Sequence, residues 1–77
     1  MEQSIKVFNI KIIGHTYCWE LKADATTWVL RDSPAVLMSG YIADGIAHCT
    51  YMHASMELVS ARMMKKIKAA IRRSSRS

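Results

Sequence analysis

Residues 16–23, TYCWELKA, alternate between two sets of side chains. Tyr17, Trp19 and Leu21 occupy odd positions, and mostly polar residues occupy the even ones. Because successive side chains of a strand point to opposite faces, this pattern predicts a half-buried antiparallel strand. Such a strand needs hydrogen-bonded neighbours, and the flanking segments supply them.

The segments on both sides of this strand also favour extended structure. Residues 5–13 are rich in β-branched side chains, and Gly14 and His15, which suit a turn, follow them. Residues 26–31, TTWVLR, come after a weaker turn and suit a third strand. We therefore expect a three-stranded antiparallel meander over residues 1–31.

The pattern changes at an Asp-Ser-Pro run, residues 32–34. An Asp or Ser side chain can cap a helix, and proline is well tolerated at the first helical position. A helix that began there would be weakened at Gly40 and Gly45, since each glycine costs about 1 kcal/mol in a helix interior. Residues 34–44 are therefore predicted to form a short helix or a kinked turn.

A longer helical pattern begins at Ile46. Apolar residues then recur every three or four positions, the spacing of one face of an α-helix, at Cys49, Met52, Met56, Val59, Met63, Ile67 and Ala70. Residues 46–73 are predicted to form one amphipathic helix, with a frayed tail at 74–77. The complete expectation is a single α+β domain, residues 1–77, whose meander packs against this long C-terminal helix.

The predicted helix is longer than the predicted sheet. At about 1.5 Å per residue it spans roughly 40 Å, whereas a strand of eight residues spans only about 27 Å. Its last turns would therefore extend past the sheet with apolar side chains that need cover. These side chains, Met63, Met64, Ile67 and Ile71, form a predicted partner interface, and self-association through them predicts a homodimer.

Positive charge is concentrated near the end of the chain. The net charge is +5, but residues 1–57 carry four bases and six acids, whereas residues 58–77 carry seven bases and no acid. Two or three cations would serve the negative end of a helix dipole, and the others exceed that need. An acid-free basic segment attracts phosphate or an acidic surface. Its basic residues are Arg62, Lys65, Lys66, Lys68, Arg72, Arg73 and Arg76.

This basic segment predicts a small non-enzymatic regulatory protein that binds nucleic acid, or a nucleoprotein, through those basic residues. Each lysine or arginine that contacts a phosphate adds affinity that weakens with salt. The predicted helix contains no Asn or Gln, the residues whose side chains pair with adenine, so we expect little sequence specificity.

A protein partner is the alternative. In this hypothesis the chain is a small inhibitor or adaptor of the kind found in phages and mobile elements. It would dock its Met-rich helix, or a sheet edge, into an acidic groove of a larger host complex, since methionine side chains adapt to varied surfaces. A membrane partner is not expected, because the apolar side of the helix lacks the Trp and Phe typical of interfacial helices.

Two pairs of possible metal ligands do not amount to a predicted metal site. His15 and Cys18 lie near a predicted turn, and Cys49 and His53 are one helical turn apart. A hairpin and a helix can hold zinc in this way. However, the order of the ligands is unusual, and the 30 residues between the pairs far exceed the spacing of common zinc fingers. We expect no metal and no other cofactor.

No catalytic arrangement is predicted either. Cys18 has His15 nearby in sequence, but nothing identifies an acid to orient that histidine, or an oxyanion hole. The chain also has no glycine-rich phosphate loop and no paired carboxylates.

Trp19 and Trp28 are expected in the core beneath the helix; on an open sheet face they would instead stack on single-stranded bases.

The cysteine content favours a reducing compartment. The chain has two cysteines in 77 residues, whereas small secreted domains usually carry several pairs. The first residues lack the basic start and apolar run of a signal peptide, and no stretch is apolar enough to span a membrane. We expect a cytoplasmic protein with free thiols; a disulfide between Cys18 and Cys49 is the alternative.

Overall fold

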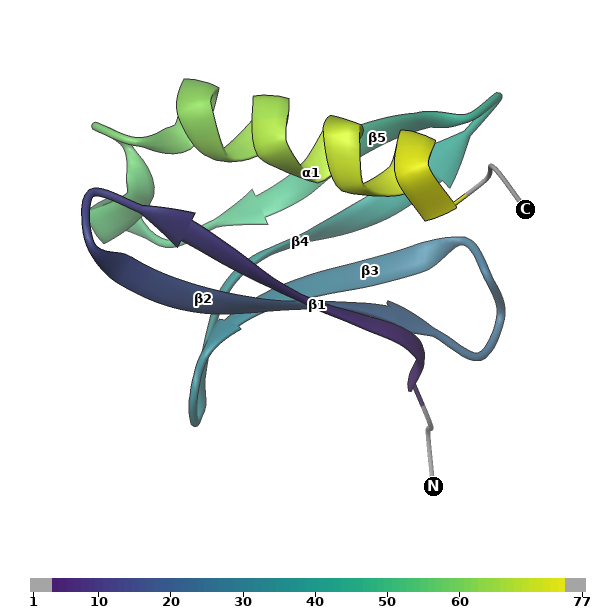
Figure 1. Cartoon of the computed structure of the whole chain (residues 1–77), viewed down its shortest axis with the longest axis horizontal. Helices are drawn as coiled ribbons and strands as arrows, with labels where there is room; N and C mark the ends of the chain where they lie inside the picture. The colour runs from purple at the N-terminus through teal and green to yellow at the C-terminus, as the bar shows by residue number, and fades with distance from the viewer. Residues whose placement is uncertain (1–3, 75–77) are drawn as a thin grey trace.

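Five strands precede the C-terminal helix in the computed structural model (Figure 1). The structure describes residues 4–74. The strands are β1 (Ser4–Ile12), β2 (His15–Lys22), β3 (Thr27–Asp32), β4 (Ala35–Ala43) and β5 (Ile46–Met52). A short 3-10 helix, η1 (Ala54–Met56), then leads to the helix α1 (Ser60–Ser74).

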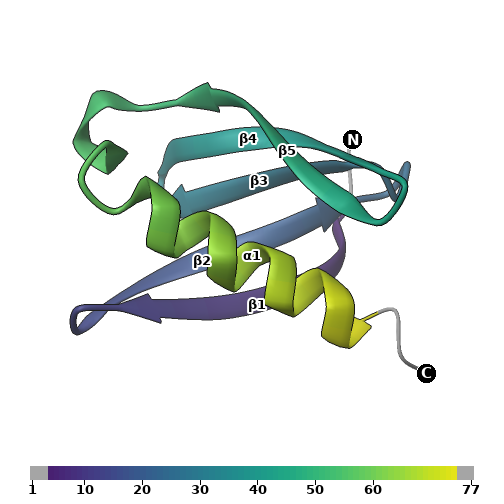
Figure 2. The ribbon, with the colours of Figure 1, turned by 90° about the horizontal axis from the view of Figure 1, so that it is seen from above.

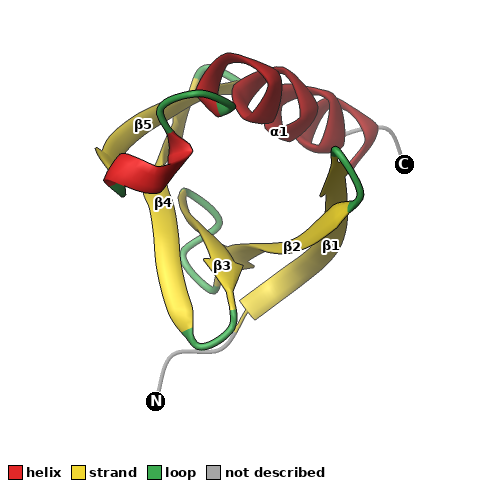
Figure 3. Ribbon diagram, turned by 90° about the vertical axis from the view of Figure 1, so that its left-hand side faces the viewer, coloured by secondary structure: helices red, strands yellow, loops and turns green. Residues whose placement is uncertain are grey.

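The strands follow one another in chain order across a curled sheet, and every neighbouring pair is antiparallel. The edge strands β1 and β5 lie on either side of α1 (Figure 3), and the helix contacts both of them. Seen from above, α1 runs along the sheet between these two strands (Figure 2). The helix therefore covers the opening that the curled sheet leaves between its edges.

The sheet is larger than the sequence analysis predicted. The α+β class is confirmed, but the three-stranded meander is wrong, because two further strands follow the first three. Residues 34–44, predicted as a short helix or kinked turn, contain β4, and the beginning of the predicted helix over residues 46–73 is β5. Strand β2 does lie where the alternation in residues 16–23 predicted a strand.

The error at residues 32–34 arose because one sequence signal serves two structures. Asp and Ser before a proline suit a helix start, but they also suit a tight turn. Here Ser33 and Pro34, joined by a cis peptide bond, connect β3 to β4, and Asp32 pairs with Ala35 across the turn. The chain therefore reverses direction and continues the sheet.

The glycines that we expected to weaken a helix have different roles in the sheet. Asp44 and Gly45 have φ angles of 54° and 75°, and they form the two-residue turn between β4 and β5. Positive φ at both positions suits this kind of hairpin turn, for which Asp-Gly is a favoured pair. Gly40 lies within β4, where a Cβ atom would overlap the backbone carbonyl of His48 and press on the Trp28 indole. Only glycine fits there.

The helix begins at Ser60 rather than Ile46. The β-branched and aromatic residues of segment 46–52, which include Ile46, Thr50 and Tyr51, favour a strand. With 15 residues, α1 is about 22 Å long. Figure 1 shows it ending within the length of the sheet, so the predicted overhang does not occur.

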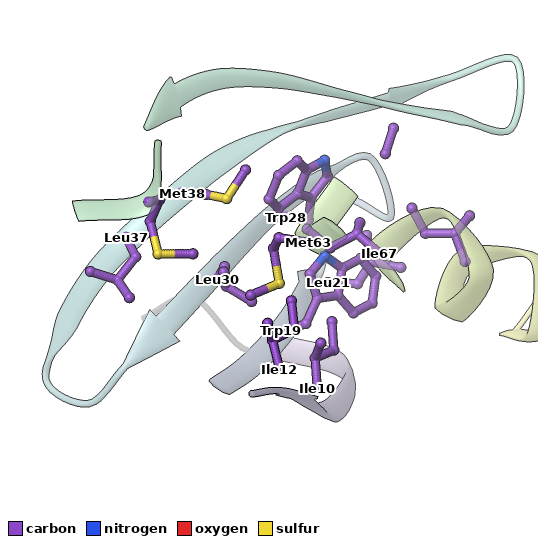
Figure 4. Packing of buried hydrophobic residues seen from close by; sticks show 13 residues of the cluster. Ile10, Ile12, Trp19, Leu21, Trp28, Leu30, Leu37, Met38, Met63 and Ile67 are labelled. Carbon is purple, nitrogen blue, oxygen red and sulfur yellow. The ribbon is translucent and has the colours of Figure 1, made fainter. Parts of the chain in front are cut away.

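The core fills the space between the inner face of the sheet and α1 (Figure 4). Trp19 and Trp28 are fully buried, which confirms their predicted place in the core and leaves neither indole exposed for base stacking. The Trp28 Nε1–H donates to the backbone carbonyl of Tyr41 at 3.2 Å. The largest fully buried side chains come from β2, β3, β4, η1 and α1: Trp19, Trp28, Leu30, Met38, Met56, Met63 and Ile67.

The turn between β2 and β3 depends on Asp24. Its carboxylate accepts hydrogen bonds from the backbone N–H groups of Thr26 and Thr27 and from the Thr27 hydroxyl, at 2.7–2.9 Å. The hydrogen bonds from Thr27 and Thr26 lower the pKa of Asp24 from 3.8 to about 2. The charged carboxylate therefore stabilises this turn above pH 4, and the contribution is lost as pH falls through the lowered pKa.

The packing of α1 predicts a large difference between two matched substitutions. Ile67→Ala should lower the free energy of unfolding by about 2–5 kcal/mol, because it leaves a cavity at a fully buried position. Ile46→Ala removes the same atoms from a side chain that is 51% exposed, and it should cost about 1 kcal/mol or less. Urea denaturation measures both. Equal losses would contradict the placement of α1.

Candidate functional site

The solvent side of α1 carries six cations and no acid. All six are exposed, and we call this surface the basic face of α1; it consists of Arg62, Lys65, Lys66, Lys68, Arg72 and Arg73. Arg76, the seventh predicted contact, lies outside the described residues. The basic face therefore lies on a single element.

The apolar side of α1 holds the basic face in position. Met63, Ile67, Ala70 and Ile71 are buried, at spacings of three or four residues, and the cations occupy the remaining directions around the helix. Three of the residues predicted to contact a partner are thus in the core of this chain, and the fourth, Met64, packs partly buried against that core. They are covered because the curled five-stranded sheet reaches both sides of the helix.

One row of residues on α1, which includes two cations, adjoins β1. Lys66, Ala69 and Arg73 follow one another at helical spacing and line a groove of about 180 Å³ between α1 and β1. The facing wall is formed by Asn9, Ile10 and Lys11. A lysine from the sheet therefore joins two cations from the helix around one concave surface.

Sequence analysis did not predict the contribution of Lys11. The alternation of β1 indicates that Lys11 is exposed, because its neighbours Ile10 and Ile12 are buried. Nothing in that pattern tells which strand will flank the helix. The position of Lys11 beside Lys66 and Arg73 depends on the edge strand β1 lying next to α1.

The cations that line the groove differ from Arg31 and Lys22 in their partners. Arg31 Nε lies 3.0 Å from Glu20 Oε2, and Lys22 Nζ lies 3.7 Å from Glu20 Oε1. Within the part of the chain that the structure describes, Lys11, Lys66 and Arg73 form no ion pair with a carboxylate. Their charges are therefore available to a ligand.

The four residues considered as metal ligands lie in separate environments. His15 Nε2 is 2.9 Å from Asp32 Oδ2, and Cys18 lies on β2. Cys49 is on β5, and His53 caps η1 by accepting a hydrogen bond from a backbone N–H. Among the described residues, no three His, Cys, Asp or Glu side chains gather closely enough to hold a metal ion.

The two cysteines are free and partly buried. Burial, and then the neighbouring negative charge of Glu20, raise the pKa of the Cys18 thiol. The Cys49 thiol donates to the backbone carbonyl of Tyr51 at 3.1 Å. A raised pKa disfavours the thiolate, which is the nucleophilic form, so the surroundings of Cys18 do not activate it for catalysis.

A second exposed surface lies on the β4–β5 hairpin. Tyr41 stacks on His48 across the two strands, with ring centroids 4.8 Å apart. Tyr41, Ile46 and Tyr51 are 44–51% exposed. This hairpin therefore presents apolar and aromatic side chains to solvent.

Comparisons with known protein families, with curated proteins and with solved structures each found no match. Within residues 4–74, no helix is long and apolar enough to cross a membrane. What the chain binds must therefore be inferred from the surfaces described above.

Proposed function

We propose that this chain is a small non-enzymatic regulatory protein that binds nucleic acid, or a nucleoprotein, through the basic face of α1. The observation that carries this proposal is the presence of six exposed cations on a 15-residue helix without an acid. The helix dipole accounts only for Arg72 and Arg73, which lie in the last turn. A polyanionic ligand accounts for the other four.

The attachment of α1 to the core supports this proposal. Met63 and Ile67 are fully buried, so the helix is already folded and oriented before any ligand arrives. A disordered basic segment would lose conformational entropy on binding, which lowers its affinity. The basic face avoids most of that cost, because only its side chains need to become ordered.

The chemistry of the basic face favours contacts with the phosphate backbone. α1 contains no Asn or Gln, so the usual bidentate contact with adenine is absent. Lysine and arginine can each neutralise a phosphate and release its counterion, whatever the base sequence. The ligand is therefore nucleic acid bound with little sequence preference and with strong dependence on salt.

The proposed compartment is the cytoplasm. Both cysteines are free thiols, which suits a reducing environment. Cytoplasmic nucleic acid or nucleoprotein would be accessible to the basic face there. Fractionation of the cells that express the chain tests this placement, and recovery outside the cytoplasm would contradict it.

Charge removal from the basic face should weaken nucleic-acid binding more than equal charge removal elsewhere. Lys65→Gln combined with Lys68→Gln should reduce the affinity for a labelled mixed-sequence oligonucleotide, measured by fluorescence anisotropy. The slope of log affinity against log salt should become shallower by about 1.4–1.8, because two phosphate contacts are lost.

The control is Lys6→Gln combined with Lys22→Gln, which removes the same net charge from β1 and β2. It should leave the affinity closer to that of the unmodified chain. Equal losses in the two double variants would mean that binding follows net charge alone. No binding by the unmodified chain at low salt would refute the proposed function.

A second candidate function is a small inhibitor or adaptor that docks on a protein. The exposed Tyr41, Ile46 and Tyr51 on the β4–β5 hairpin favour it, because exposed aromatic and apolar side chains are common at protein interfaces. We also propose this hairpin as the surface of a homodimer. Met63, Ile67 and Ile71, which were predicted to form the dimer interface, are buried within the chain.

Sedimentation velocity tests the hairpin surface. The unmodified chain should form dimers as its concentration increases, and Ile46→Ser with Tyr51→Ser should abolish them because less apolar area is buried on association. The same pair should leave oligonucleotide affinity nearly unchanged, since neither residue lies on α1. A chain that remains monomeric at all concentrations would remove the homodimer from the proposal.

A further inference from the structure

The groove between α1 and β1 combines charge, concavity and hydrogen-bond donors. Lys66 and Arg73 line it from α1, Asn9, Ile10 and Lys11 line it from β1, and no carboxylate lines it. Ala69 lies between the two helical cations in the same row, and its small side chain leaves the space between them open. The lining residues of the two elements are more than 50 positions apart in the sequence.

Lys11, Lys66 and Arg73 line one concave surface, and none has an ion-pair partner among the described residues. An anion in the groove would be attracted by all three positive charges. The C-terminal end of α1 opposes an anion, but a helix end carries only about half of a unit charge. Three full positive charges exceed that opposing charge, so the groove favours anions.

We propose that this groove binds phosphate of a nucleic-acid backbone, as a defined subsite of the basic face. This inference rests on the proposed function. Arg73 can offer two parallel N–H donors to phosphate oxygens, Lys11 and Lys66 supply point charges, and the Asn9 carboxamide can donate as well. A strand with one charge on each phosphate brings adjacent phosphates to all three cations, which a single carboxylate does not.

This subsite changes the shape of the proposed interface. The nucleic acid contacts two elements, and its backbone crosses from the helix onto the edge strand β1. Lys11 then belongs to the binding surface even though it is not part of α1. Free inorganic phosphate has the same chemistry as the backbone group, and it serves as a probe of the groove.

The first test compares Lys11→Gln with Lys6→Gln. Both lysines are exposed on β1, but only Lys11 lines the groove. Lys11→Gln should weaken oligonucleotide binding several-fold and make the salt slope shallower by about 0.7–0.9, the contribution of one phosphate contact. Lys6→Gln should change both quantities less, and Lys11→Arg should retain binding because it keeps the charge.

The second test maps the groove with inorganic phosphate. In ¹H–¹⁵N spectra of the intact chain, phosphate should shift the backbone amides of Asn9, Lys11 and Ala69, and Lys11→Gln should reduce these shifts. Chloride at equal ionic strength is the control. An acidic peptide that competes with phosphate at the groove more effectively than an oligonucleotide does would overturn the assignment to nucleic acid.

The two proposals fail in different ways. If the oligonucleotide binds but Lys11→Gln behaves like Lys6→Gln and phosphate shifts no groove amide, the subsite is wrong and the basic face remains the binding surface. If phosphate shifts the groove amides but no oligonucleotide binds at low salt, the nucleic-acid function is refuted and the groove is a site for free phosphate.

Discussion

The packing of the apolar side of α1 between the edge strands β1 and β5 is the interaction on which the rest of this structure depends. Met63 and Ile67 are fully buried there, and they lie in one cluster with the indoles of Trp19 and Trp28. Without the helix, the inner face of the curled sheet would be exposed to water, at a cost of roughly 25 cal/mol for each Å² of apolar surface. A chain of 77 residues has little stability to spare for such a loss.

The same packing produces the candidate site. Because one side of α1 must face the core, its cations are confined to the solvent side, and the edge strand β1 comes to lie next to Lys66 and Arg73. Lys11 joins them only through this arrangement. The groove is therefore a consequence of how the helix closes the sheet, and stability and the proposed ligand binding depend on opposite sides of one element. Substitutions on the two sides should consequently affect different properties.

The parts of this fold that follow local rules could be predicted from the sequence. The alternation around Trp19 predicted β2, and the acid-free helix end predicted the cations of the basic face. Asp44-Gly45 is a favoured hairpin pair, but Gly45 was interpreted only as a weak point of a helix, because the apolar spacing of the following residues fits a helix. Burial of Met63 and the position of Lys11 could not be predicted, because both depend on how the curled sheet brings β1, at the start of the chain, next to α1, near its end.

Native-state hydrogen exchange of the α1 amides tests the central claim most directly, since it reports how firmly the helix is held in the core. If α1 closes the sheet, the amides of Ile67, Ala70 and Ile71 should be protected nearly as strongly as those of Trp19 and Leu30, and all should exchange through the same global unfolding. Exchange of the helix amides by local opening, much faster than exchange of the amides in β2 and β3, would contradict the account. It would mean that the sheet is stable without α1.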